Sequence, residues 1–262
     1  MSILSNFNQN AQHLAKKFIS AEYRELQRIK SLSRFQVGHS SILGASICYT
    51  DSLSFHNMYY DIFKSEIFKF SADSAKPIII DGGANIGLAS IYLKRLYPNS
   101  EILAIEADPK IYKILTENFS SLGYKDIKAV NKALWKEAGT LSFSSDGADG
   151  GHLDKAGGVQ VETFTLSSII NRPIDLLKLD IEGAELEVIK EAESSLHHVK
   201  NAFIEYHSFQ GQPQRLNELL DILTRAGFKY FIQSLYLLRA PFIEHKVEAG
   251  MDLQLNIFAY RA

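Results

Sequence analysis

Short apolar runs alternate with amphipathic segments along the chain from residue 77 onward. The apolar runs predict strands at residues 78–81, 101–106, 127–131, 175–180 and 200–207. Apolar positions at helical spacing predict helices between them, near residues 87–97, 109–122, 184–196 and 213–226. This alternation is typical of βαβ units around a parallel sheet.

The last part of the chain breaks the alternation. Residues 229–238 and 253–260 both have strand patterns, and no helical pattern separates them. We therefore expect these two strands to form an antiparallel pair at the end of an otherwise parallel sheet.

The N-terminal part has a different pattern and predicts a helical extension or cap, residues 1–76, ahead of a main α/β domain, residues 77–262. Residues 9–32 carry apolar side chains at helical spacing, with charged residues between them. This helix could pack on the domain, pack on a second subunit as a homodimer, or cover a substrate. Further helix is expected at residues 59–70 and a strand within residues 41–49.

One insert, residues 144–158, is rich in glycine and lies between two β-like runs at residues 140–143 and 159–164. We interpret Gly150, Gly151 and His152 as part of a mobile lid over the substrate. A connector without a function of its own is the alternative.

Composition excludes several classes of protein. The 262 residues carry a formal net charge of −2, which gives no sign of a nucleic-acid partner. Cys48 is the single cysteine, so no intrachain disulfide is expected. No apolar run reaches the roughly 18 residues of a membrane span, and residues 1–10 lack the apolar core of a signal peptide. We therefore expect a soluble cytoplasmic protein.

The strand at residues 78–81 leads directly into a glycine-rich turn and a helix. Its acid and turn read Asp-x-Gly-x-Asn-x-Gly over residues 81–87. This spacing differs from the G-x-G-x-x-G fingerprint of dinucleotide-binding proteins, which disfavours a nicotinamide oxidoreductase. It resembles the first motif of class I S-adenosylmethionine (SAM) methyltransferases. The turn residues expected to face SAM are Gly82, Gly83, Ala84, Asn85 and Gly87, and Asp81 is placed to hold the SAM amine.

The next strands supply candidate partners for the ribose and adenine. Glu106 ends its strand about 20–25 residues after the turn, where a carboxylate suits two ribose hydroxyls. Helix capping is the alternative for Glu106, but Asp108 before Pro109 is better placed for that role. Ala107 follows Glu106, and Asn131 and Leu134 follow the third strand, where they are expected to border the cofactor.

Acidic side chains also gather at the ends of the fourth and fifth strands. Lys178 and Asp180 share one side of the strand at 175–180, and Glu182 follows in the turn. Glu205 and His207 likewise share one side of the strand at 200–207. We interpret these five residues as a reaction site, because burying a lysine requires compensation. A buried Lys–Asp pair with a helix-starting Glu is the structural alternative.

Four segments together resemble the FkbM family of class I SAM-dependent methyltransferases. They are Asp-Gly-Gly-Ala-Asn-Ile-Gly, Ile-Glu-Ala-Asp-Pro, Leu-Leu-Lys-Leu-Asp-Ile-Glu-Gly-Ala-Glu and Ile-Glu-Tyr-His. The resemblance implies a Rossmann-like, seven-stranded and mostly parallel sheet with an antiparallel C-terminal hairpin. It implies SAM bound by Asp81, Gly83, Asn85, Gly87 and Glu106, with S-adenosylhomocysteine as product. It also implies O-methylation of a sugar, glycan or natural-product hydroxyl.

Methyl transfer to a hydroxyl needs in-line positioning and removal of a proton. His207 is our first candidate base, followed by Asp180 or Glu182. Asp180, Glu182, Glu205 and His207 could also hold a divalent ion and grip a vicinal diol. Capping and hydrogen-bonding roles explain these acids equally well, so no metal is predicted. A protein or N-methyltransferase and a non-catalytic SAM-binding module are the alternative functions.

Overall fold

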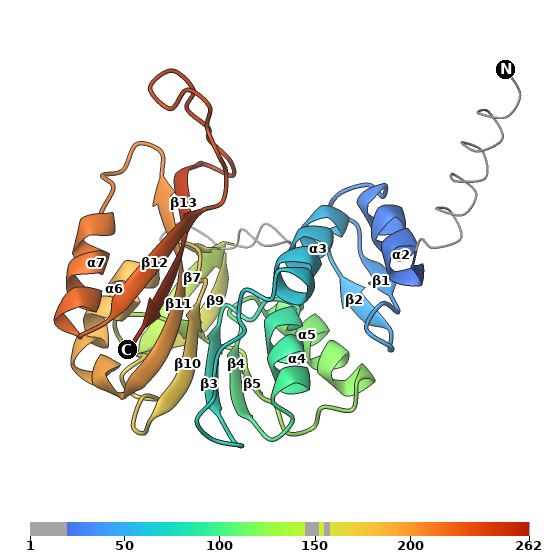
Figure 1. The fold of residues 1–262 in the computed structure, drawn as a ribbon, viewed down its shortest axis with the longest axis horizontal. Helices are drawn as coiled ribbons and strands as arrows, with labels where there is room; N and C mark the ends of the chain where they lie inside the picture. The colour runs from blue at the N-terminus through green and yellow to red at the C-terminus, as the bar shows by residue number, and fades with distance from the viewer. Residues whose placement is uncertain (1–19, 145–151, 155–157, 262) are drawn as a thin grey trace, which may run out of the picture.

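The computed structural model describes residues 20–144, 152–154 and 158–261, shown as a ribbon in Figure 1. Its centre is a seven-stranded sheet with strand order β12-β13-β11-β10-β3-β4-β5. The strands are β3 (Ile78–Gly82), β4 (Glu101–Ile105), β5 (Lys128–Val130), β10 (Ile174–Leu179), β11 (Val199–Phe209), β12 (Lys229–Ser234) and β13 (Met251–Tyr260). The predicted Rossmann-like α/β fold is confirmed.

The sheet is parallel from β11 to β5, and β13 runs antiparallel to both of its neighbours. The expected antiparallel pair of C-terminal strands is therefore confirmed, with β13 inserted between β12 and β11. This insertion places Asn256 directly opposite Glu205 and Gln254 opposite His207.

Helices cover both faces of the sheet (Figure 1). Successive strand residues face opposite layers: Ile79 packs in one apolar core and Ile80 in the other. Two helices pack in the core of Ile79, α4 (Leu88–Leu96) and α5 (Pro109–Ser121). Two others pack in the core of Ile80, α6 (Glu185–Glu191) and α7 (Leu216–Arg225), and a 3-10 helix (Glu193–His198) follows α6.

The N-terminal extension packs against the same core as α4 and α5. Its elements are α2 (Ala21–Lys30), β1 (Gly38–Ser40), β2 (Ile47–Tyr49), α3 (Ser52–Tyr59) and a π-helical turn (Tyr60–Lys64). Leu26 and Ile29 of α2 are buried in that core, so this helix packs on the domain. A homodimer through it stays a prediction, and residues 9–19 of the expected helix lie outside the described residues.

Two expectations for the extension were wrong in extent. The helix expected at residues 59–70 begins at Ser52, because the side chain of Asp51 accepts a hydrogen bond from the Ser54 backbone amide and caps it. It ends at Lys64. Of residues 41–49, only Ile47–Tyr49 form a strand, which pairs with β1.

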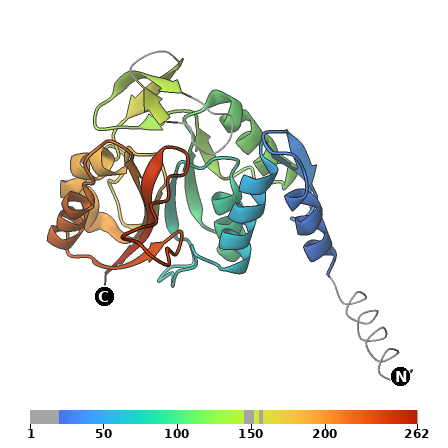
Figure 2. The ribbon, with the colours of Figure 1, turned by 90° about the horizontal axis from the view of Figure 1, so that it is seen from above.

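A second sheet, of order β6-β9-β7-β8, follows β5. Its strands are β6 (Ala133–Leu134), β7 (Gly139–Ser144), β8 (His152–Asp154) and β9 (Val159–Phe164). The two expected β-like runs are confirmed and pair antiparallel as β7 and β9. In Figure 2 this yellow-green sheet stands well away from α2. His152 lies opposite Ser144 in β8, whereas Gly150 and Gly151 of the proposed lid lie outside the described residues.

Among the residues that the structure describes, no helix is both long enough and apolar enough to cross a membrane.

Candidate active site

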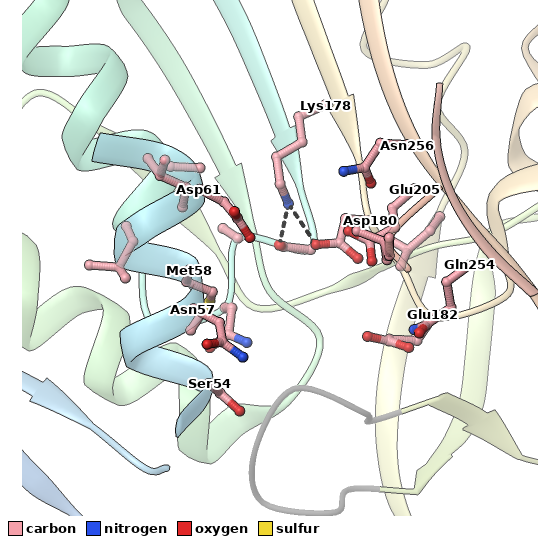
Figure 3. Close-up of a pocket in the computed structure, with 18 of the residues that line it drawn as sticks. Ser54, Asn57, Met58, Asp61, Lys178, Asp180, Glu182, Glu205, Gln254 and Asn256 are labelled. Carbon is pink, nitrogen blue, oxygen red and sulfur yellow. Dashed lines mark hydrogen bonds and ion pairs between the residues drawn. The ribbon is translucent and has the colours of Figure 1, made fainter. Parts of the chain in front are cut away.

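A cleft of about 950 Å³ opens at the carboxyl ends of the central strands. Open α/β sheets bind ligands at this edge. Figure 3 shows α3 on one side of the cleft and the ends of β10, β11 and β13 on the other. Cofactor and reaction-site candidates share this cleft, among them Gly83, Ala84, Asn85, Glu106, Ala107, Leu134, Lys178, Asp180, Glu182 and Glu205.

The turn after β3 touches the turn after β10. Gly83 has a φ of +72°, and a Cβ on it would lie 1.7 Å from the carbonyl oxygen of Asp180. Only glycine fits this position, because both the conformation and the space exclude a side chain. The glycine thus brings the predicted cofactor turn against the predicted reaction site.

Asp81 lies beneath the cleft and does not line it. The side chain is fully buried, and one carboxylate oxygen accepts a 2.6 Å hydrogen bond from the Ser90 hydroxyl. The other oxygen is 3.3 Å from the Lys178 Nζ atom. Gly82 and Gly87 also lie outside the cleft lining, and Gly87 packs against the Phe119 ring. These residues support the turn after β3 without lining the cleft.

Glu106 holds the ends of two turns together and faces the cleft. One carboxylate oxygen accepts from the Asn85 backbone amide and the other from the Asp108 amide, both at 2.8 Å. Burial raises the pKa of Glu106 to about 7, although both hydrogen bonds favour the charged form. Asp108 caps α5 by accepting from the Lys110 and Ile111 amides, which leaves Glu106 free of the capping role.

Of the three residues predicted to border the cofactor after Glu106, two line the cleft and one does not. Leu134 and Ala107 line it. Asn131 does not line it; its side-chain amide donates to the carbonyl oxygens of Glu106 at 2.8 Å and Ala107 at 2.9 Å. Asn131 therefore fixes the turn that carries Glu106.

Lys178 is buried and links the turn after β3 to the turn after β10. Its Nζ atom donates to the Gly83 carbonyl oxygen at 2.8 Å and lies 3.5 Å from an Asp180 carboxylate oxygen (Figure 3). Burial lowers the pKa of Lys178, but the charges of Asp180 and Asp81 outweigh it and raise that pKa above the usual value. The ammonium group is therefore charged at neutral pH.

His207 sits behind the acidic residues and does not line the cleft. Its Nδ1 atom is 3.1 Å from a Glu185 oxygen, and its Nε2 atom is 3.5 Å from Glu205 and 3.8 Å from Glu182. Burial lowers its pKa, but Glu185 and Glu205 raise it well above the usual value. Both ring nitrogens thus face carboxylates, and the ring is protonated at neutral pH.

The acids around His207 differ in their environment. Burial raises the pKa of Glu182 well above its usual value, and burial together with the Asp180 charge raises that of Glu205. The side chain of Asp180 is 29% exposed, the largest exposed fraction of the three. Asp180, Glu205 and His207 each offer a ligand atom, and these atoms lie within 4.8 Å of one another.

Several residues of the site were not identified from the sequence. Glu185 is buried and accepts hydrogen bonds from the Ile181 and Gly183 amides, which fixes the turn after β10. Glu185 is the last residue of the segment Leu-Leu-Lys-Leu-Asp-Ile-Glu-Gly-Ala-Glu, two residues after Gly183. This position in the segment could have identified it as a residue of the site. Other cleft residues come from α3, its π-helical turn and β13, namely Ser54, Asn57, Met58, Asp61, Gln254 and Asn256 (Figure 3).

Comparison with known families agrees with this geometry. The methyltransferase FkbM domain matches residues 81–230, which is more than half of the chain. The match covers the turn after β3, Glu106 and the complete acidic cluster.

Three curated relatives are methyltransferases. Methyltransferase sdnD of Sordaria araneosa is 31% identical over 209 residues, which cover 63% of this chain and 79% of that protein. Hexuronic acid methyltransferase AglP of Haloferax volcanii is 27% identical, with 50% of this chain and 56% of that protein covered. The 2-O-methyltransferase NoeI of Sinorhizobium fredii is 26% identical, with 56% and 71% covered.

Proposed function

Because the chain belongs to the FkbM family of methyltransferases, we propose that it transfers the methyl group of SAM to a hydroxyl of a sugar, glycan or natural-product acceptor. The names of two relatives support an oxygen acceptor and a sugar, since one is a 2-O-methyltransferase and another a hexuronic acid methyltransferase. SAM is the cofactor, and S-adenosylhomocysteine is the product.

The contact between Gly83 and Asp180 is the observation that carries this proposal. It joins a cofactor half of the cleft, with Glu106 and Leu134, to an acceptor half, with Asp180 and Glu205. A sulfonium between the halves would have its methyl group next to the acids. Such positioning supplies much of the rate of an in-line transfer.

We assign the contacts with SAM to those predicted cofactor residues that line the cleft. The backbone of Gly83, Ala84 and Asn85 faces the methionine part of SAM, and Glu106 accepts hydrogen bonds from the two ribose hydroxyls. Each Glu106 oxygen keeps a lone pair for this, because each accepts one backbone amide. Ala107 and Leu134 border the adenine. Asp81, Gly82, Gly87 and Asn131 support these residues from behind.

Asp180 is our candidate base for the acceptor hydroxyl. It lines the cleft, and one of its carboxylate oxygens lies 3.5 Å from the Lys178 Nζ atom. His207, the first candidate from the sequence, is enclosed by carboxylates and protonated, so it positions the acids instead. Glu182 and Glu205, with raised pKa values, face the acceptor as hydrogen-bonding groups.

Incubating the purified chain with SAM and a panel of sugars tests this function. Hexuronic acids, other monosaccharides and peptides with free amines would be compared by mass spectrometry of the products. We expect methylated sugar hydroxyls and an equal amount of S-adenosylhomocysteine. Methylation of the peptide amines alone would replace the proposal by an N-methyltransferase.

A further inference from the structure

The end of β11 and the turn after β10 bring three possible ion ligands to one point. Glu205 and His207 are two residues apart on β11 and share a face, and Asp180 follows the neighbouring strand β10. One ligand atom from each lies within 4.8 Å of the others. Ligand atoms about 2.1 Å from one ion are roughly 3.0–4.2 Å apart, so a small contraction would bring all three into coordination.

The imidazole of His207 is oriented for this role. Its Nδ1 atom faces Glu185 at 3.1 Å, and its Nε2 atom points toward Glu205 at 3.5 Å. Glu185 is itself fixed by the backbone amides of Ile181 and Gly183. A carboxylate that accepts the other ring N–H is the usual outer partner of a metal-binding histidine. An ion at Nε2 would displace the proton that the ring carries there in the absence of the ion.

Asn256 gives an independent indication of a ligand. It lies directly opposite Glu205 in the antiparallel pair of β11 and β13, so both side chains are on the same face of the sheet. The residue is only 7% exposed, and it lines the same cleft (Figure 3). Within the described residues its Oδ1 atom has no hydrogen-bond partner. A buried amide oxygen normally has one, and a cation or a water bound to it would supply it.

Carboxyl groups outnumber basic groups in this cluster. Five carboxyl groups, from Asp81, Asp180, Glu182, Glu185 and Glu205, lie beside two basic groups, Lys178 and His207. Carboxylate oxygens are the ligands that hard divalent cations prefer. A divalent cation at the open side of the cluster would therefore find suitable ligands.

We propose that Asp180, Glu205 and His207 bind one divalent cation of the Mn²⁺ or Mg²⁺ type at the acceptor end of the cleft, with Asn256 beside it. This inference rests on the proposed methyl transfer and adds how the acceptor is held. A hydroxyl oxygen bound to such an ion would be more acidic. Asp180 would accept the hydroxyl proton. The hydroxyl oxygen would then bond to the methyl carbon while the carbon–sulfur bond breaks and leaves its electron pair on sulfur.

Direct titration with Mn²⁺ tests the site without an acceptor. Electron paramagnetic resonance would measure free Mn²⁺ in the presence of the full chain, with and without SAM. We expect one Mn²⁺ per chain. Glu205→Gln and His207→Gln should each weaken Mn²⁺ binding by about tenfold or more, and both should keep SAM affinity within about threefold. SAM binding by each variant also shows that it is folded.

Glu162→Gln is the matched control, because it removes the same charge from an exposed side chain of the second sheet. It should bind Mn²⁺ as the wild type does. Absence of Mn²⁺ binding, or equal binding by Glu205→Gln and Glu162→Gln, would overturn the ion site. If SAM still binds in that sample, the proposed function stands and the ion alone is rejected. If SAM does not bind either, the result contradicts the proposed methyl transfer itself.

Discussion

Gly83 and Asp180 are in direct contact, and no side chain other than hydrogen fits between them. A Cβ at Gly83 would lie 1.7 Å from the Asp180 carbonyl oxygen. Two strands that are neighbours in the sheet, β3 and β10, thereby bring their terminal turns together at the cleft. The proposed cofactor half and the proposed acceptor half meet at this approach.

Gly83→Ala should therefore displace one of the two turns. Gly123→Ala is the control, because Gly123 has a similar φ of +76° with nothing near its Cβ position. Conformation alone costs roughly 1–2 kcal/mol at either site, so Gly123→Ala should lose about that much stability and Gly83→Ala should lose more, because of its clash with the Asp180 backbone. Only Gly83→Ala should also weaken SAM binding, by more than tenfold. Equal SAM affinities, measured by calorimetry, would mean that the contact does not shape the cofactor site.

Lys178→Met should destabilise the protein, because it leaves the buried Asp81 carboxylate without its cation. Breaking a buried ion pair costs about 3–5 kcal/mol, and urea denaturation would measure the loss. The double variant Asp81→Asn with Lys178→Met should recover part of it. A double variant that loses the full sum of both single effects would show that the two residues do not interact.

SAM affinity should depend on pH through Glu106, whose pKa is raised to about 7. The protonated form increases as pH falls through that value, and it cannot accept hydrogen bonds from both ribose hydroxyls on free oxygens. The dissociation constant should therefore rise about tenfold from pH 8 to pH 6. Glu106→Gln should bind SAM weakly at both pH values with little change between them. A wild-type affinity that is the same at both would remove Glu106 from the ribose site.

Asp180→Asn should separate chemistry from cofactor binding. Loss of a general base lowers turnover by about 10²–10⁴-fold, whereas SAM affinity should change little. Glu187→Gln is a matched control, because Glu187, on α6, pairs with Arg215 and does not line the cleft. Stopped assays of S-adenosylhomocysteine formation give the comparison. Turnover by Asp180→Asn at the Glu187→Gln rate would exclude Asp180 as the base.

The sequence predicted the strands and the location of Glu106, Asp180 and Glu205 well. Their side chains follow the ends of parallel strands, which meet at one edge of a sheet whatever the side-chain details. It could not show that Asp81 turns toward Ser90 and Lys178, since strand position does not determine which neighbours a carboxylate finds. Nor could it place Asn256, which reaches the cleft only because β13 inserts beside β11.

The sequence also did not show that the N-terminal extension contributes residues to the cleft. Asn57, Met58 and Asp61 line the cleft because α3 and the π-helical turn pack in the same apolar core as α4. No sequence motif links these segments. The π-helical turn at Tyr60–Lys64 carries Asp61 and has no sequence signature. Such turns are frequent at functional sites.

Calorimetric titration with SAM, with NAD⁺ as the control ligand, tests the central claim most directly. We predict one SAM per chain with micromolar affinity, no binding of NAD⁺, and loss of SAM binding in Glu106→Ala. NAD⁺ binding without SAM binding would contradict the assignment of the turn after β3 to SAM and, with it, the proposed methyl transfer.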